Sequence, residues 1–94
     1  MTAAVRRVHF LVVGRVQGVG FRAHTQAAAQ ARGLVGFVRN RRDGAVEGEA
    51  EGPAVSIAEF AAWLHEGSPW SRVERVELQD LPVDGSEQDF AVRR

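Results

Sequence analysis

The chain has 94 residues, no cysteine and a formal net charge of zero. This length is typical of one domain, and we expect residues 1–94 to form a single domain. The absence of cysteine excludes disulfides, thiolate metal sites and a cysteine nucleophile. No apolar stretch approaches the roughly 20 residues of a membrane span, and the N-terminus lacks the architecture of a signal peptide. These features predict a soluble, cytoplasmic protein that does not associate with membranes.

All 12 basic residues are arginine, and most of them occur early in the chain. Residues 1–42 hold eight arginines and no acidic residue, whereas residues 43–94 hold four arginines and all 12 acidic residues. The absence of lysine excludes a Walker-type phosphate loop, so any phosphate site must use arginine and backbone amides. Either the two halves neutralise each other on folding, or the first half attracts an anionic ligand. The zero total argues against broad nucleic-acid binding.

The first predicted strand covers residues 5–13, which are apolar on both faces near the end, as in a central strand. A glycine-rich loop follows it. Residues 21–32 are rich in good helix formers, and Gly33 is a natural end for that helix. Residues 34–40 are β-branched and aromatic, which predicts a second strand.

A hairpin and a second helix come next. Asp43 and Gly44 predict the turn of the hairpin. Residues 45–52 alternate between glutamate and small or apolar residues, which predicts a strand with one face in water. Pro53 suits the first turn of the helix, and Gly67 ends it. The apolar stripe of this helix comprises Ile57, Phe60, Ala61 and Leu64.

Residues 72–78 and 89–93 predict two further strands, separated by the turn-like segment PVDGSE. The complete order is β-α-β-β-α-β with a short final strand. This order indicates an α+β fold, the ferredoxin-like split βαβ sandwich, in which two helices cover one face of an antiparallel sheet.

The stretch GRVQGVGFR, residues 14–22, joins the first strand to the first helix. Its glycines allow successive N–H groups to turn toward one point. The N-terminus of the helix adds unpaired N–H groups and the positive end of a dipole. These features predict an anion-binding cradle, although the glycine spacing differs from the dinucleotide-binding fingerprint.

Arg22 lies in or near the first turn of this helix, where a cation is unfavourable by up to roughly 1 kcal/mol. A residue whose charge is unfavourable for local structure, without a visible gain in stability, is a candidate functional residue. A bound phosphoryl group would reverse the penalty, and the planar guanidinium suits two phosphate oxygens. The alternative is a tight turn between strand and helix that carries a solvated arginine.

Two blocks of the chain resemble the acylphosphatase family. GRVQGVGFR resembles its signature loop, G-x-V-Q-G-V-x-F-R, and GFVRNRRDGAV, residues 36–46, resembles its second block, G-[FW]-V-x-N-x-x-[DG]-G-x-V. The likeness covers nearly the whole chain, including WLHEGSP after the second helix and the F-x-V ending. Members of this family split the mixed anhydride of a carboxylic acid and phosphate into carboxylate and inorganic phosphate.

The resemblance implies a role for each part of these blocks. Arg22 would grip the phosphoryl oxygens, and Asn40 would hold the attacking water. The loop would surround the same oxygens with the backbone amides of Val16, Gln17, Gly18, Val19 and Gly20. No metal, cofactor or covalent intermediate would be needed. The partners would be an acyl phosphate and inorganic phosphate but no nucleic acid, and we expect a monomer.

Asn40 ends a predicted strand where the hairpin turns, and on residue type alone it is better explained as a turn former. Parallel pairing of residues 8–13 with residues 35–40 is expected to bring it beside the loop. The chain has no cysteine, lysine or tyrosine, and the loop has no serine, threonine, histidine or carboxylate. Positioning and charge stabilisation are therefore the expected means of catalysis.

Three alternatives stay open. RNA-binding modules share this element order, but they need exposed aromatic residues on the central strands, and residues 45–52 contain none. The loop could instead bind phosphate without turnover, as a sensing or interaction module. The domain could also belong to a larger maturation enzyme, although the independent start and end of the chain favour a free-standing enzyme.

The three histidines of the chain and Trp70 have no predicted catalytic role. His9, His24 and His65 lack metal-ligand spacing, so no metal site is expected. His24 is expected on the surface of its helix or in packing, and Trp70 either packs against a helix end or lies exposed.

Overall fold

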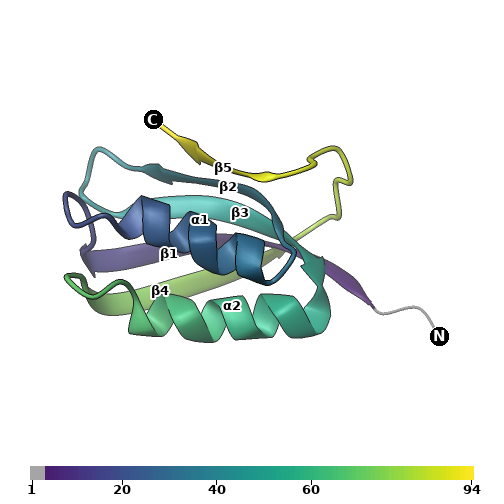
Figure 1. The fold of residues 1–94 in the computed structure, drawn as a ribbon, viewed down its shortest axis with the longest axis horizontal. Helices are drawn as coiled ribbons and strands as arrows, with labels where there is room; N and C mark the ends of the chain where they lie inside the picture. The colour runs from purple at the N-terminus through teal and green to yellow at the C-terminus, as the bar shows by residue number, and fades with distance from the viewer. Residues whose placement is uncertain (1–3) are drawn as a thin grey trace.

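The computed structural model describes residues 4–94 and arranges them in two layers, a sheet and a pair of helices (Figure 1). All seven predicted elements are present, and the first and fourth strands are longer than the sequence pattern indicates. The strands are β1 (Val5–Arg15), β2 (Val35–Asn40), β3 (Val46–Pro53), β4 (Arg72–Leu81) and β5 (Phe90–Arg93), and the helices are α1 (Phe21–Ala31) and α2 (Ala54–Glu66).

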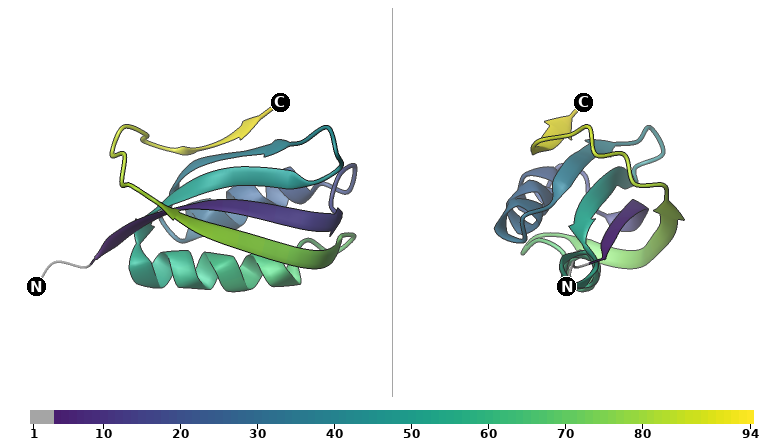
Figure 2. Two further views of the ribbon diagram at one scale, coloured as in Figure 1. Left: turned by 180° about the vertical axis from the view of Figure 1, so that it is seen from behind. Right: turned by 90° about the vertical axis from the view of Figure 1, so that its right-hand side faces the viewer.

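The strands form one sheet in the order β4-β1-β3-β2-β5. Three of the four pairings are antiparallel, and β5 pairs with β2 in parallel. Both helices cover the same face of this sheet, as the end-on view of Figure 2 shows. The predicted ferredoxin-like sandwich is confirmed, with the short final strand as a parallel addition at one edge. Among residues 4–94, no helix has the length and hydropathy that crossing a membrane requires.

The expected direct pairing of residues 8–13 with residues 35–40 is wrong, because β3 lies between β1 and β2. β3 suits this central position because its inner residues are small. A side chain at Gly48 would collide with the carbonyl oxygen of Phe37 and the ring of Phe10. Since β1 and β2 are both antiparallel to β3, they still run in the same direction and finish at the same end of the sheet.

The core lies between the helices and the sheet. Phe10 of β1 meets Phe60 of α2 edge to face, with ring centroids 5.4 Å apart. The small residues Ala28 and Ala29 are buried on α1, which allows this helix to approach the strands closely. The other buried apolar residues of the predicted strand and stripe are Val8, Val12, Ile57 and Leu64. One face of the first strand and three of the four residues of the predicted stripe are therefore buried, whereas Ala61 of that stripe is half-buried.

The open face of the sheet carries ion pairs, where the sequence predicts contact with water. Glu51 of β3 is only 6% exposed. Arg7 of β1 is buried beside it and contacts Glu49, Glu51 and Glu87 at 2.8, 3.2 and 2.8 Å. The glutamates of β3 therefore neutralise an arginine from the basic half of the chain.

Glu51 also holds the connection between β4 and β5. Its carboxylate accepts hydrogen bonds from the backbone N–H groups of Asp84 and Gly85, at 2.7 and 3.0 Å. The bond from Asp84 and the contact with Arg7 outweigh burial and hold the pKa of Glu51 below its ordinary value. These contacts bind the connection to the sheet and so help to fix the position of β5.

The lowered pKa of Glu51 predicts that folding is sensitive to acid. The stabilisation is fully present above the ordinary glutamate value of about 4.5 and is lost as the pH falls through the lower folded value. We expect Glu51→Gln to reduce the free energy of unfolding at neutral pH by about 1–3 kcal/mol. The variant should also flatten the acid dependence, measured by urea unfolding at a series of pH values. Glu59→Gln, at an exposed site, is the matched control, and an unchanged acid dependence in Glu51→Gln would assign the effect to other groups.

Candidate active site

The site begins with the backbone of the loop between β1 and α1, residues 16–20. Gly18 and Gly20 have φ angles of 73° and 74°, in the left-handed region that side chains disfavour. Gly20 is the N-cap of α1, and no side chain caps the helix there. The glycines therefore produce the tight curvature that the sequence predicts, immediately before the N-terminus of a helix.

This loop borders a pocket of about 210 Å³. The pocket is lined by Val16, Gly18, Gly20, Phe21, Arg22, Ala23, Asn40 and Val92. Arg22 and Asn40 thus line one pocket, together with three of the five loop residues. The other two, Gln17 and Val19, belong to the same loop but do not line the pocket.

Arg22 is held in place by the last strand. Its Nη1 donates a hydrogen bond to the carbonyl oxygen of Arg93 at 3.0 Å. One turn further along α1, Nε2 of Gln26 donates to the carbonyl oxygen of Phe90 at 2.9 Å. Within the described residues, Arg22 makes no ion pair, so its charge is not neutralised by a carboxylate. The guanidinium is therefore oriented by β5 while most of its donors stay available to an anion.

Asn40 is the last residue of β2 and pairs with Val46 across the hairpin. Its Oδ1 is buried and has no hydrogen-bond partner within residues 4–94. A buried polar oxygen without a partner is costly, and in native proteins such atoms are rare. A residue that lines the pocket of Arg22 thus carries an acceptor without a partner among the described residues.

The side chain of Gln17 makes contacts that the sequence did not predict. Its Nε2 donates to the carbonyl oxygens of Arg41 and Ala45, at 2.7 and 2.9 Å. These residues form the turn between β2 and β3, so the side chain links the loop to the hairpin that carries Asn40. The contacts span 24 and 28 residues of sequence. No local pattern in the chain signals a pairing over that separation.

A second pocket of about 420 Å³ adjoins Asn40 on the hairpin. Its lining is rich in arginine and comprises Arg39, Asn40, Arg41, Arg42, Asp43, Glu47 and Arg94. Arg39 and Arg41 contact Glu47 at 2.8 and 3.6 Å, and Arg41 also contacts Asp43 at 2.9 Å. The positive charge of the first half of the chain is thus partly neutralised here.

The two carboxylates in this cluster are stabilised in their charged form. Burial raises the pKa of Glu47, but hydrogen bonds from Arg39 and His9 outweigh it and leave the pKa below the ordinary value. The backbone N–H of Ala45 and the nearby Arg41 lower the pKa of Asp43. Both carboxylates are therefore ionised at neutral pH and remain partners of the arginines.

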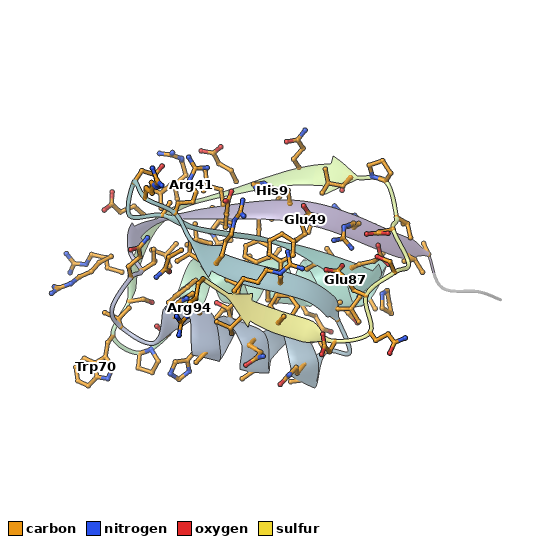
Figure 3. The ribbon with its side chains drawn as sticks, turned by 90° about the horizontal axis from the view of Figure 1, so that it is seen from above. His9, Arg41, Glu49, Trp70, Glu87 and Arg94 are labelled. Carbon is orange, nitrogen blue, oxygen red and sulfur yellow. The ribbon has the colours of Figure 1, made fainter. Side chains whose placement is uncertain are left out.

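Neither His24 nor Trp70 lines the pocket of Arg22 and Asn40. His24 is exposed on α1, as expected for a residue on the helix surface. Trp70 is 80% exposed and points away from the ribbon in Figure 3, which decides between the two expectations for it.

The fold and the pocket together define a class of protein: a ferredoxin-like sandwich with a glycine-rich loop, an arginine and an asparagine at one end of its sheet. The family model described as acylphosphatase matches residues 8–92. The chain is 52% identical to acylphosphatase-1 of Gallus gallus over 90 residues, which covers 93% of this chain and 91% of that protein. It is 46% identical to an acylphosphatase of Methylococcus capsulatus, with 96% and 98% covered.

Solved structures agree with these relatives. The acylphosphatase of Bacillus subtilis superposes with a TM-score of 0.91 at 36% identity, covering 97% of this chain and all of that one. The chain therefore belongs to the acylphosphatase family.

Proposed function

We propose that this protein hydrolyses the carboxyl–phosphate bond of acyl phosphates and releases a carboxylate and inorganic phosphate. One observation carries the assignment to this pocket: Arg22, three residues of the glycine loop and Asn40 all line the same small pocket. Membership of the acylphosphatase family supports the same reaction.

The phosphoryl group binds to the loop and to Arg22. Backbone N–H groups of residues 16–20, at the N-terminus of α1, donate to its oxygens, and the helix dipole favours the negative charge. The guanidinium of Arg22 grips two oxygens through its planar fork. The carbonyl oxygen of Arg93 accepts one N–H of Arg22 and so orients that fork toward the pocket. These donors stabilise the charge that spreads over the phosphoryl oxygens in the transition state.

Asn40 places the nucleophile. Its Oδ1 accepts a hydrogen bond from a water molecule, whose oxygen attacks phosphorus in line with the leaving carboxylate. The new bond joins the water oxygen to phosphorus, the bond from phosphorus to the acyl oxygen breaks, and a water proton passes to the phosphate formed or to solvent. A carboxylate is a good leaving group, so positioning and charge stabilisation suffice without a covalent intermediate.

Turnover of benzoyl phosphate in the presence of EDTA tests this proposal. We expect release of benzoate and phosphate, with inorganic phosphate as a competitive inhibitor. A phosphate monoester such as p-nitrophenyl phosphate is the comparison substrate, and we expect slower hydrolysis because its leaving group is poorer. Phosphate binding without turnover would identify a passive anion-binding module, and loss of activity with the chelator would overturn the metal-independent mechanism.

We also propose that residues 1–94 act as one domain and as a monomer. The continuous sheet supports a single domain, and the presence of Arg22, Asn40 and the loop in one pocket of one chain supports a monomer. Light scattering of the purified protein tests the oligomeric state. The cytoplasmic location stays a prediction, which imaging of the tagged protein in its own cells would test.

A further inference from the structure

We propose that the side chain of Gln17 is a positioning residue for catalysis, which sets the distance between the phosphate-binding loop and Asn40. The inference rests on the proposed function, because it gives Gln17 a role only if Asn40 holds the attacking water. The side chain of Gln17 does not line the pocket, so it acts through the residues that it holds.

The contacts of Gln17 connect the two halves of the site. The backbone of Gln17 lies between Val16 and Gly18, which both border the pocket. Its Nε2 uses both N–H groups, one on the carbonyl oxygen of Arg41 and one on that of Ala45, at 2.7 and 2.9 Å. Arg41 directly follows Asn40 in the chain, so the two bonds hold the loop against the turn that begins beside Asn40.

The sheet fixes Asn40 through its pair with Val46, which in turn pairs with Val12, but it does not fix the loop. β3 separates β1 from β2, so no ladder of hydrogen bonds joins the strand before the loop to the strand that ends at Asn40. The loop and the turn both extend beyond the paired residues, because the last pair of β1 with β3 joins Val12 to Val46. Within the described chain, the two bonds of Gln17 are the hydrogen bonds that directly join residues 16–20 to residues 41–45.

The chemistry of the contact requires an amide of this length. Both partners are backbone carbonyl oxygens, which only accept, and the NH₂ of glutamine supplies two donors. A glutamate at this position would be an acceptor facing two acceptors, and an asparagine is shorter by one methylene. The turn itself is closed by a hydrogen bond from the N–H of Arg41 to the carbonyl oxygen of Ala45, at 2.8 Å. Gln17 therefore binds a turn that is already formed and fixes its place.

Gln17→Met tests the inference, because methionine keeps the length of the side chain and removes both donors. Misplacement of a reacting group by about 1 Å can cost on the order of 10²-fold in rate. We expect kcat for benzoyl phosphate to fall by about 10- to 100-fold. The inhibition constant of inorganic phosphate should change by less than about threefold, because Arg22 and the backbone amides still bind the phosphoryl group.

A double-mutant cycle with Asn40→Ala separates positioning from general support of the fold. If Gln17 acts by placing Asn40, Gln17→Met should lower kcat by less than about twofold in the Asn40→Ala background, because no water-holding group is left to position. Gln26→Ala is the matched control. Its amide links α1 to β5 on the side of Arg22, so its effect should be equally large in both backgrounds.

Each outcome decides the matter. Equal losses from Gln17→Met in both backgrounds, or a phosphate inhibition constant that weakens in parallel with kcat, would overturn the inference. A normal rate in Asn40→Ala would overturn it as well, because Gln17 would then have no residue to act through. Absence of turnover in the unmodified protein is a different result and would count against the proposed function. Gln17→Ala, checked for folding by thermal denaturation, repeats the cycle should the methionine variant be unstable.

Discussion

Replacement of Arg22 by alanine is expected to reduce kcat/KM for benzoyl phosphate by about 10²- to 10⁴-fold and to weaken inhibition by inorganic phosphate. Two charge-assisted hydrogen bonds are lost, each contributing about 1.5–3 kcal/mol. Together these losses correspond to a factor on the order of 10²–10⁴. The charge of Arg22 is also lost from a position where the described residues offer no carboxylate to neutralise it. Steady-state kinetics and phosphate inhibition measure both effects.

Arg15→Ala is the matched control for this variant. Arg15 is exposed at the end of β1, beside the same loop, and makes no ion pair within residues 4–94. We expect its rate to stay within about threefold of the unmodified protein, since an exposed charge contributes little to a local site. Arg22→Lys keeps the charge but lacks the fork, so it should recover only a small part of the activity. Unchanged phosphate inhibition in Arg22→Ala would show that the anion binds elsewhere.

Replacement of Asn40 by alanine is expected to lower kcat by about 10²-fold or more while phosphate inhibition changes little. The reason is that Oδ1 of Asn40 holds the attacking water, whereas Arg22 and the loop amides bind the phosphoryl group. The variant also removes a buried oxygen that has no partner among the described residues, so we expect no loss of folding stability beyond about 1 kcal/mol. Kinetics with benzoyl phosphate, phosphate inhibition and thermal denaturation measure the three quantities.

Asn40→Asp provides the second comparison at this position. It keeps the shape and the acceptor oxygen but adds a negative charge beside the phosphoryl site, so phosphate inhibition should weaken together with the rate. The pair of variants therefore separates the loss of an acceptor from the addition of charge. If phosphate affinity fell as steeply as the rate in Asn40→Ala, Asn40 would be a ligand-binding residue and would not be the residue that holds the water.

The arginines of the pocket beside Asn40 differ from Arg22 in that two of them are paired with carboxylates. Arg39 and Arg41 are already paired with Glu47 and Asp43, so they add less to the field at the site than their number indicates. Arg22 makes no such pair within the described chain. The uneven distribution of charge therefore has two structural outcomes, neutralisation on the sheet and an available cation at the loop.

Much of the fold could be predicted from the sequence because it depends on local patterns. Apolar residues on both faces of residues 5–13 predicted a central strand, and a helical period predicted the buried stripe of α2. Glycine at positions 18 and 20 permits left-handed backbone that other residues disfavour, so the loop conformation also follows from residue type. Arg22 was identified in the same way, as a cation at the wrong end of a helix.

The tertiary structure alone decided how these pieces meet. Sequence reasoning placed β1 directly beside β2, but the small residues of β3 allow it to occupy the position between them. The hydrogen bond from Arg22 to the carbonyl of Arg93 spans 71 residues, and those of Gln17 span 24 and 28. Local patterns record periodicity and backbone preference, but such long-range contacts depend on which strands become neighbours. The residues of this candidate site could therefore be predicted from the sequence. The contacts that hold them in place could not, because they form only when the strands pack into one sheet.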